Sequence, residues 1–277
     1  MQGLLWTAAM LAVLPLVAIV THIVGSGFAA LSTSLFFKSP APAGVSGGGM
    51  ANGIAGTLLL VAMASVIGLP FGIGAGLFLA ERAGTRLARI TRFIADVLSG
   101  LPSIVLGIVA WELIVRPSGQ FSAIAGGVAL GALMLPLVAR ATEEMVRLVP
   151  NALRESALAL GYSQWRTSLT VVLRTALPGV LTAVLVALAR VAGETAPLLF
   201  TALGNAYWSL NPTEPIAALP LQIFSYAQSP YDDQRAQAWA GAFLLLVLIA
   251  GLSLIARLVV RARQRLLRAG PSRTDAP

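Results

Sequence analysis

The sequence predicts an all-α, polytopic membrane protein with six transmembrane helices. Of its 277 residues, 57% are hydrophobic and only 11% are charged, and the mean hydropathy is +0.84. A soluble domain carries about 25% charged residues, so this composition cannot cover a water-facing surface. Four stretches hold no Asp, Glu, Lys or Arg: 1–37, 39–80, 117–139 and 236–256. Each is long enough to cross a bilayer core, which takes about 20 apolar residues.

The six spans follow from these apolar runs and from the charges and turns that bound them. A turn-rich segment with several Gly and Pro, 38–49, separates the first span from the second and cannot itself span. Glu81 and Arg82 end the second span, and Asp96 and Glu112 lie near the ends of the third. The predicted spans are 4–24, 54–80, 93–115, 121–139, 176–203 and 236–259.

The distribution of basic residues predicts the orientation. The segments 81–92 and 140–175 hold four and five arginines, and the chain from Arg257 onward holds six. Lys38, Arg116 and Arg235 are the basic residues in the segments on the other side. Loops rich in Lys and Arg stay in the cytoplasm. Both termini are therefore predicted to be cytoplasmic, which agrees with an even number of spans.

The residue types that the chain lacks exclude several kinds of chemistry. It has no cysteine and one histidine, His22, which rules out disulfides, thiolate chemistry and an imidazole cluster for a metal. Its one lysine, Lys38, follows Phe37, so no G-x-x-x-x-G-K-[ST] nucleotide loop exists. The net charge of +8 comes from arginines between apolar spans, a pattern typical of cytoplasmic membrane loops and not of a nucleic-acid-binding surface.

The cytoplasmic segment 140–175 predicts a helix-turn-helix that projects from the membrane. Asn151 follows a proline and can cap a new helix over 152–160. Gly161 suits the left-handed residue after that helix, and Ser163 can cap the next one. A short helix of mixed polarity suits docking into a groove of another protein. An ordinary surface connector remains the alternative when this loop is taken alone.

The residues of this loop resemble the EAA loop of ABC importer permeases. In that family a Glu-Ala-Ala run is followed by a glycine and, further on, by a Leu-Pro pair. Here Glu155, Ser156 and Ala157 precede Gly161, and Leu-Pro-Gly follows at 177–179. Ser156 replaces the first alanine of the family pattern. The family usually has another proline closer to the glycine, and Arg174 occupies that position here.

Motifs in other segments carry a narrower resemblance. Gly-Glu-Thr-Ala-Pro-Leu lies within 190–200, and Leu-Ser-Gly-Leu-Pro-Ser lies within 96–105. Further matching runs fall at 52–60, 140–143 and 218–223. Together these motifs resemble the PstA-type permease subunits of phosphate ABC importers, over most of the chain after its first helix. The resemblance implies a type I ABC permease fold.

The same resemblance implies partners and a division of labour. Such a subunit pairs with a second permease (PstC-like) and a dimer of ATPase subunits (PstB-like), and a periplasmic phosphate-binding protein (PstS-like) delivers inorganic phosphate. Glu155, Ser156, Ala157 and Gly161 would belong to the helix that couples to the ATPase. The chain would be no enzyme, would need no cofactor or metal, and would lie in the bacterial inner membrane.

The resemblance also divides the chain into three parts. Residues 1–50 form the first helix and an outer loop, 51–265 the permease core, and 266–277 a cytoplasmic tail. The polar segment before the last span contains a predicted short helix, 216–227, at the outer surface. We expect this helix to cover the pathway or to meet the binding protein, and a plain connecting loop is the alternative.

Charged residues inside the spans are candidates for the substrate pathway. Arg190 and Glu194 are four residues apart on the predicted fifth helix. Intramembrane ionisable groups are costly and often mark a solute pathway, and an arginine fork suits a phosphate-type anion. Arg140 and Glu143 form a similar pair at the inner end of the fourth span. A structural ion pair is the alternative in both cases, and Asp96 is expected to complement a helix dipole.

The remaining sequence features have structural explanations, and two other functions stay open. Gly68, Gly72 and Gly76 predict close helix packing, and His22 is expected to be packed or hydrogen-bonded. An ion-gradient-driven secondary transporter of a small anion would also tolerate broken helices and an intramembrane ion pair. An intramembrane enzyme would need convergent catalytic groups, which the spans lack.

Overall fold

The computed structural model describes residues 2–268, and its described part is helical apart from connecting segments and an isolated bridge between Leu203 and Ile216. The last element runs to Arg268, and the predicted tail, 266–277, lies mostly outside the described residues. In chain order the elements are α1 (Gln2–Ala29), α2 (Thr33–Phe37), α3 (Ala51–Glu81), α4 (Arg86–Gly100), α5 (Ser103–Ala110), the π-helix η1 (Trp111–Val115), α6 (Arg116–Ser118), α7 (Ala123–Arg147), α8 (Asn151–Ala159), α9 (Gln164–Arg166), the π-helix η2 (Thr167–Val172), α10 (Leu173–Ala192), α11 (Ala196–Thr201), α12 (Leu219–Ala227) and α13 (Asp232–Arg268).

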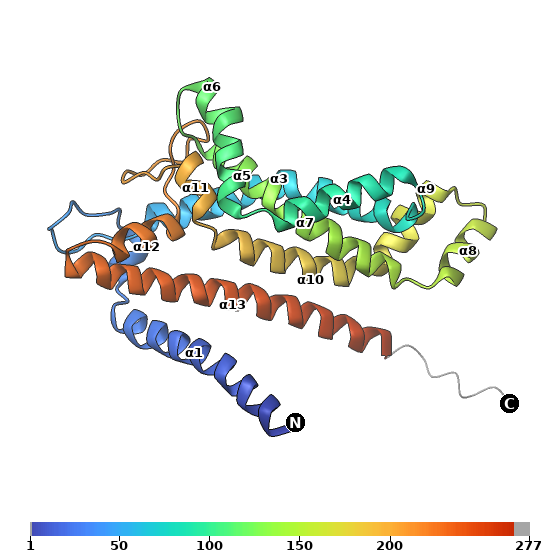
Figure 1. Ribbon diagram of the computed structural model, residues 1–277, viewed down its shortest axis with the longest axis horizontal. Helices are drawn as coiled ribbons and strands as arrows, with labels where there is room; N and C mark the ends of the chain where they lie inside the picture. Colours follow the sequence, from blue (N-terminus) through green and yellow to red (C-terminus); the bar gives the residue numbers. More distant parts are fainter. Residues whose placement is uncertain (1, 269–277) are drawn as a thin grey trace.

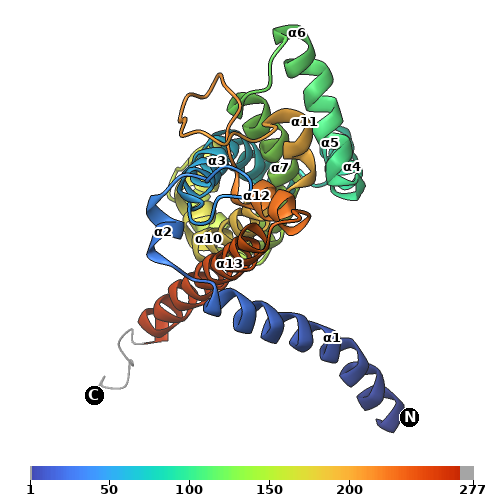
Figure 2. The ribbon, with the colours of Figure 1, turned by 90° about the vertical axis from the view of Figure 1, so that its left-hand side faces the viewer.

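The long helices form an elongated bundle with two different ends. α3, α7, α10 and α13 run along the long axis, with α8 and α9 at one end and α12 at the other (Figure 1). α5 and α6 project sideways from this bundle. Seen along the bundle, α1 extends away from the other helices (Figure 2). The arginine-rich segments predicted to be cytoplasmic therefore share the end that carries α8 and α9.

Within residues 2–268, five helices are long and apolar enough to cross a membrane, and a bent pair supplies a sixth crossing if it counts as one span. The five are α1, α3, α7, the continuous run from α9 through α10, and α13. The bent pair consists of α4 and the run from α5 to α6, with an angle of 104° between its halves. The predicted all-α fold with six spans is confirmed in this form.

The third predicted span, 93–115, was expected to be one helix and is not. α4 ends at Gly100, and Leu101 and Pro102 have extended backbone conformations before α5 begins at Ser103. Proline lacks a backbone N–H and disfavours the helical conformation in the residue before it. The Leu-Pro pair therefore ends one helix and starts another in a new direction.

The fifth predicted span, 176–203, is also broken. α10 ends at Ala192, and Gly193, Glu194 and Thr195 connect it to the short helix α11. Pro197 lies in the first turn of α11, where its missing N–H costs no hydrogen bond. Glu194 consequently lies in the break, which corrects the expectation that it shares a helix with Arg190.

Glycines bring α3 and α7 into the most extensive helix contact of the described chain. A Cβ atom added at Gly68 would lie 2.9 Å from the Met134 side chain, and one added at Gly72 would lie 2.8 Å from the Val138 side chain. At Gly76 the added atom would lie only 2.5 Å from the Ala139 carbonyl oxygen. These distances leave no room for a side chain. The close packing predicted from the glycine spacing is confirmed.

α1 contacts the bundle through α13. The position of a Cβ atom at Gly27 lies 2.4 Å from Cβ of Phe243, so the two helices touch closely at that point. His22, expected to be packed or hydrogen-bonded, meets the ring of Trp239 edge to face with 4.7 Å between ring centres. The remaining described side chains of α1 are mostly exposed in the single chain.

At the other end, a buried hydrogen-bond network holds the segment before α13 against the start of α3. The Asn52 amide donates to the Asn205 carbonyl (2.8 Å) and accepts from the Gln222 amide (2.8 Å). The Thr57 hydroxyl accepts from the backbone N–H of Leu219 (2.8 Å). Two sequence motifs, 52–60 and 218–223, therefore meet in the fold. The short helix predicted over 216–227 is present as α12.

Candidate functional site

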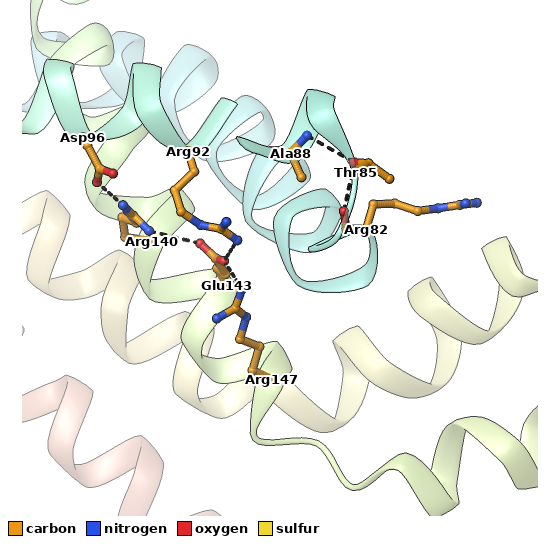
Figure 3. Close-up of polar contacts among 8 residues, drawn as sticks. All are labelled: Arg82, Thr85, Ala88, Arg92, Asp96, Arg140, Glu143 and Arg147. Carbon is orange, nitrogen blue, oxygen red and sulfur yellow. Dashed lines mark hydrogen bonds and ion pairs between the residues drawn. The ribbon is translucent and has the colours of Figure 1, made fainter. Parts of the chain in front are cut away.

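Five charged side chains gather where α4 crosses the C-terminal half of α7. Arg92 and Asp96 come from α4, and Arg140, Glu143 and Arg147 come from α7 (Figure 3). The three residues on α7 are three to four positions apart, so they share one face of that helix. The cluster contains three guanidinium groups and two carboxylates and has a net positive charge.

Glu143 is the centre of this cluster. Its side chain is only 4% exposed, and its carboxylate pairs with Arg92 at 2.5 Å, Arg147 at 2.7 Å and Arg140 at 3.4 Å. Arg140 also pairs with Asp96. Burial of a carboxylate is costly unless it is paired and hydrogen-bonded, and these three guanidinium groups supply the compensation.

The local sequence of α4 places Arg92 and Asp96 against α7. The Thr85 hydroxyl accepts from the backbone N–H of Ala88 at 3.2 Å, which caps the start of the helix. Ala88 and Ala95, seven residues apart, are the buried side chains of α4, and their small size lets the helix approach α7. Arg92 lies between them on the same side.

The cluster corrects one expectation and extends another. Asp96 does not complement a helix dipole, because α4 begins ten residues earlier, at Arg86, and Asp96 pairs with Arg140. The predicted pair of Arg140 and Glu143 is present, but it belongs to a larger network. Sequence reasoning missed Arg92 as a partner because it lies 51 positions from Glu143, on a different helix.

The second predicted pair lies elsewhere. Arg190 Nε and Glu194 Oε1 are 4.0 Å apart, a loose ion pair in which the Arg190 side chain is 62% exposed. Gly179 of α10 packs against Met145 of α7. At about 1.5 Å per residue from that contact, Arg190 lies about 9 Å further toward the α12 end of the bundle than Arg140. The structure therefore does not join the two predicted pairs into one site.

The projecting loop has the predicted architecture. α8 (Asn151–Ala159) begins one residue before the predicted start, so Asn151 is its first residue while Pro150 takes the capping position. Gly161 has φ = +84°, and its N–H donates to the Leu158 carbonyl (2.9 Å) while the next N–H reaches Ala157 (3.2 Å). This pairing is a Schellman motif, which glycine favours because it needs a left-handed residue.

α8 presents a mixed surface to the outside. Glu155 and Ser156 are exposed, Ala157 is buried, and Leu153 and Leu158 are each about two-fifths exposed. The Ser163 hydroxyl accepts from the backbone N–H of Arg166 at 3.4 Å, as the sequence predicts for a helix cap. Among residues 2–268, no group of three or more His, Cys, Asp or Glu is arranged to hold a metal ion.

The bundle with its projecting helix has the type I ABC importer permease fold. A chain of the MetNI methionine ABC transporter, in an inward-facing crystal form, has a TM-score of 0.61 at 22% identity, over 77% of this chain and 96% of that one. A chain of an amino acid ABC transporter solved with histidines has a TM-score of 0.56 at 17% identity, over 77% and 92%. These likenesses establish the fold.

Sequence comparison narrows the class. The model of the family described as binding-protein-dependent transport system inner membrane component matches residues 72–265. The phosphate transport system permease protein PstA of Yersinia pestis is 45% identical over 88% of this chain and 83% of its own length. PstA of Haemophilus influenzae is 44% identical over 93% and 92%. The chain belongs to this family of transport permeases, and within it to the PstA proteins.

Membership in this family makes the chain a membrane-embedded transport permease rather than an enzyme. A permease of this kind works with an ATPase and with other components of its transport system. The alternative of an ion-gradient-driven secondary transporter is not favoured, because relatives and fold neighbours alike are subunits of binding-protein-dependent or ABC systems.

Proposed function

We propose that this chain is one of the two permease subunits of an ATP-driven importer of inorganic phosphate and forms half of the translocation pathway. The observation that carries the proposal is the 45% identity to a phosphate transport system permease across 88% of the chain. The charge distribution agrees with an anionic substrate, because arginines outnumber carboxylates in the cluster around Glu143.

The pathway is proposed to pass Arg190 and Glu194 nearer the outside and Arg140 and Glu143 nearer the cytoplasm. Arg190 lies in a membrane-spanning helix, yet its side chain is 62% exposed in the single chain. A guanidinium group that faced lipid there would be costly, so it faces another subunit or a water-filled pathway. Arg140 is one-third exposed and keeps donors for an anion, while the nearby carboxylates limit how tightly that anion is held.

Substitution of Arg190 tests this assignment. We expect Arg190→Ala to abolish phosphate uptake in an assembled complex, because an anion would lose its fixed cationic partner. Arg116→Ala, which removes an exposed arginine at the start of α6 that pairs with Glu112, serves as the control and should transport normally. Normal uptake by Arg190→Ala, with assembly intact, would refute a pathway role and leave a structural ion pair.

Coupling to ATP is proposed to run through α8. Glu155, Ser156, Ala157 and Gly161 would form the element that docks on an ATPase subunit, and ATP hydrolysis would take place on that partner. The exposed leucines of α8 and its exposed glutamate fit an amphipathic helix lying in a protein groove. The proposed partners are a PstC-like second permease, a PstB-like ATPase dimer and a PstS-like phosphate-binding protein.

The proposed orientation places the α8 end of the bundle in the cytoplasm, with both chain termini on that side of the bacterial inner membrane. Arginine-rich segments meet at this end, where Arg82 donates to Gln164 at 3.4 Å, and the positive-inside rule favours a cytoplasmic location. We keep the division of the chain into a first helix with its loop (1–50), a core (51–265) and a tail (266–277).

Purification of the tagged chain from its native membrane in mild detergent tests the proposal. Mass spectrometry of the stoichiometric companions should identify a second permease and an ATPase that carries a P-loop. A homo-oligomer without an ATPase, in a preparation that still binds phosphate, would contradict the proposal and favour a secondary transporter.

A further inference from the structure

One arginine fastens α8 to two membrane helices at once. Arg154 Nη2 donates to the carbonyl of Val146 (3.0 Å), and Nη1 donates to that of Val149 (2.7 Å) and to the Asn151 side chain (3.0 Å). Its Nε donates to the Glu81 carboxylate at the end of α3 (3.2 Å). All three guanidinium nitrogens therefore donate hydrogen bonds, and their acceptors lie on α3, at or just after the end of α7, and on α8 itself.

These contacts add donors to carbonyls at and just beyond the end of α7. The last carbonyls of an α-helix carry partial negative charge, and the Val146 carbonyl also accepts from the Val149 N–H (3.2 Å). The guanidinium group supplies donors in a fixed fork to the carbonyls of Val146 and Val149 and neutralises Glu81. The side chains of Arg154 and Glu81 are only 20% and 24% exposed, so water competes weakly for these bonds.

The helices that Arg154 joins are closely packed against each other. α3 and α7 touch through Gly68, Gly72 and Gly76 without room for side chains, and tightly packed helices transmit displacement because they cannot deform locally. Val146, which accepts from Arg154, directly precedes Arg147, which pairs with Glu143. A displacement of α8 therefore reaches the charged cluster within one helical turn.

We propose that Arg154 is a positioning residue that locks α8 to the α3–α7 pair, with Glu81 as its anchor on α3, so that a force applied to α8 moves the inner charged cluster. This inference rests on the proposed function, since it assigns to α8 the contact with an ATPase. Without the lock, the ATPase would move α8 alone, and ATP would be hydrolysed without a matching change in the pathway.

The number of phosphate ions transported per ATP hydrolysed measures this lock directly. The complete complex is reconstituted in proteoliposomes with the binding protein, and uptake and hydrolysis are measured in parallel. Glu81→Gln removes the charge from the link to α3 and leaves the other Arg154 bonds in place, and Arg154→Lys keeps the charge but loses the fork of donors. Glu112→Gln, the same substitution in an exposed pair with Arg116, is the control.

We expect the number of phosphate ions transported per ATP to fall about fivefold in Glu81→Gln, which is the change in an equilibrium constant on losing one well-formed ion pair. In Arg154→Lys we expect this number to fall further. The control should keep the wild-type ratio. A role in folding alone would lower uptake and hydrolysis together with the amount of complex and leave the ratio unchanged. An unchanged ratio in both variants would overturn the inference. A wild-type complex without ATP-driven uptake would instead refute the proposed function, and the inference with it.

Discussion

Substitution of the buried carboxylate at the centre of the charged cluster gives the most informative stability test. Glu143→Gln keeps the size of the side chain and removes its charge. Arg92, Arg140 and Arg147 then face each other with one carboxylate, Asp96, among them. The glutamine oxygen still accepts a hydrogen bond, so the variant isolates the loss of charge pairing.

The expected magnitude follows from the burial of the partners. Breaking a fully buried ion pair by removing one member costs about 3–5 kcal/mol, and an exposed pair contributes about 1 kcal/mol or less. Glu143 is 4% exposed, whereas Arg92, Arg140 and Arg147 are 25%, 33% and 50% exposed. The cost lies between these limits, so we expect Glu143→Gln to lower the free energy of unfolding by about 2 kcal/mol.

Reversible unfolding in mixed micelles, titrated with a denaturing detergent and followed by tryptophan fluorescence, measures this loss. Glu144→Gln is the matched control, because Glu144 is the next residue on α7 and is exposed. The control should stay within about 0.5 kcal/mol of the wild type. Equal unfolding free energies for the two variants, or a more stable Glu143→Gln variant, would refute the view that this buried carboxylate holds α4 against α7.

Two further substitutions test the packing of the bundle and its outer end. Gly72→Ala should lower the free energy of unfolding by about 1–3 kcal/mol, because its Cβ atom would lie 2.8 Å from the Val138 side chain. Gly74→Ala, with nothing within 4 Å of the added atom, should raise the free energy of unfolding by up to about 1 kcal/mol through helix propensity. A Gly72→Ala variant that is more stable than Gly74→Ala in the same titration would contradict the close packing of α3 on α7. Asn52→Leu should leave buried polar partners unsatisfied at about 1–3 kcal/mol each, seen as faster hydrogen exchange around Leu219 but not in α8. Unchanged hydrogen exchange around Leu219 would show that the hydrogen bonds of Asn52 do not hold the segment before α13 in place.

Composition and charge predict the crossings of this protein well, because the cost of placing charge in a bilayer acts on each segment by itself. Charge-free runs locate the spans, and the arginine-rich ends of α3 and α7 lie together at the end that carries α8. The projecting helix is predicted to within a residue at each end, since Gly161 and Ser163 act as local signals that need no tertiary context. A Leu-Pro pair and a Gly-Glu-Thr run are equally local, yet whether they kink or break a helix depends on neighbouring helices.

The polar contacts between distant segments are the part that the sequence does not predict. Arg92 meets Glu143 across 51 positions, and Arg154 reaches Glu81 across 73 positions. Both contacts depend on the direction in which a helix leaves a turn. Helical periodicity identifies neighbours three and four residues apart, so it finds the pair of Arg140 and Glu143 and misses the larger cluster.

Reconstituted uptake tests the account most directly. The chain, a second permease, the ATPase and the binding protein are assembled in proteoliposomes, and radiolabelled phosphate is followed with and without ATP. We predict uptake that requires ATP and the binding protein, continues when ion gradients are collapsed, and is not displaced by excess sulfate or molybdate. Uptake that follows an ion gradient and proceeds without ATP or the ATPase would contradict the account.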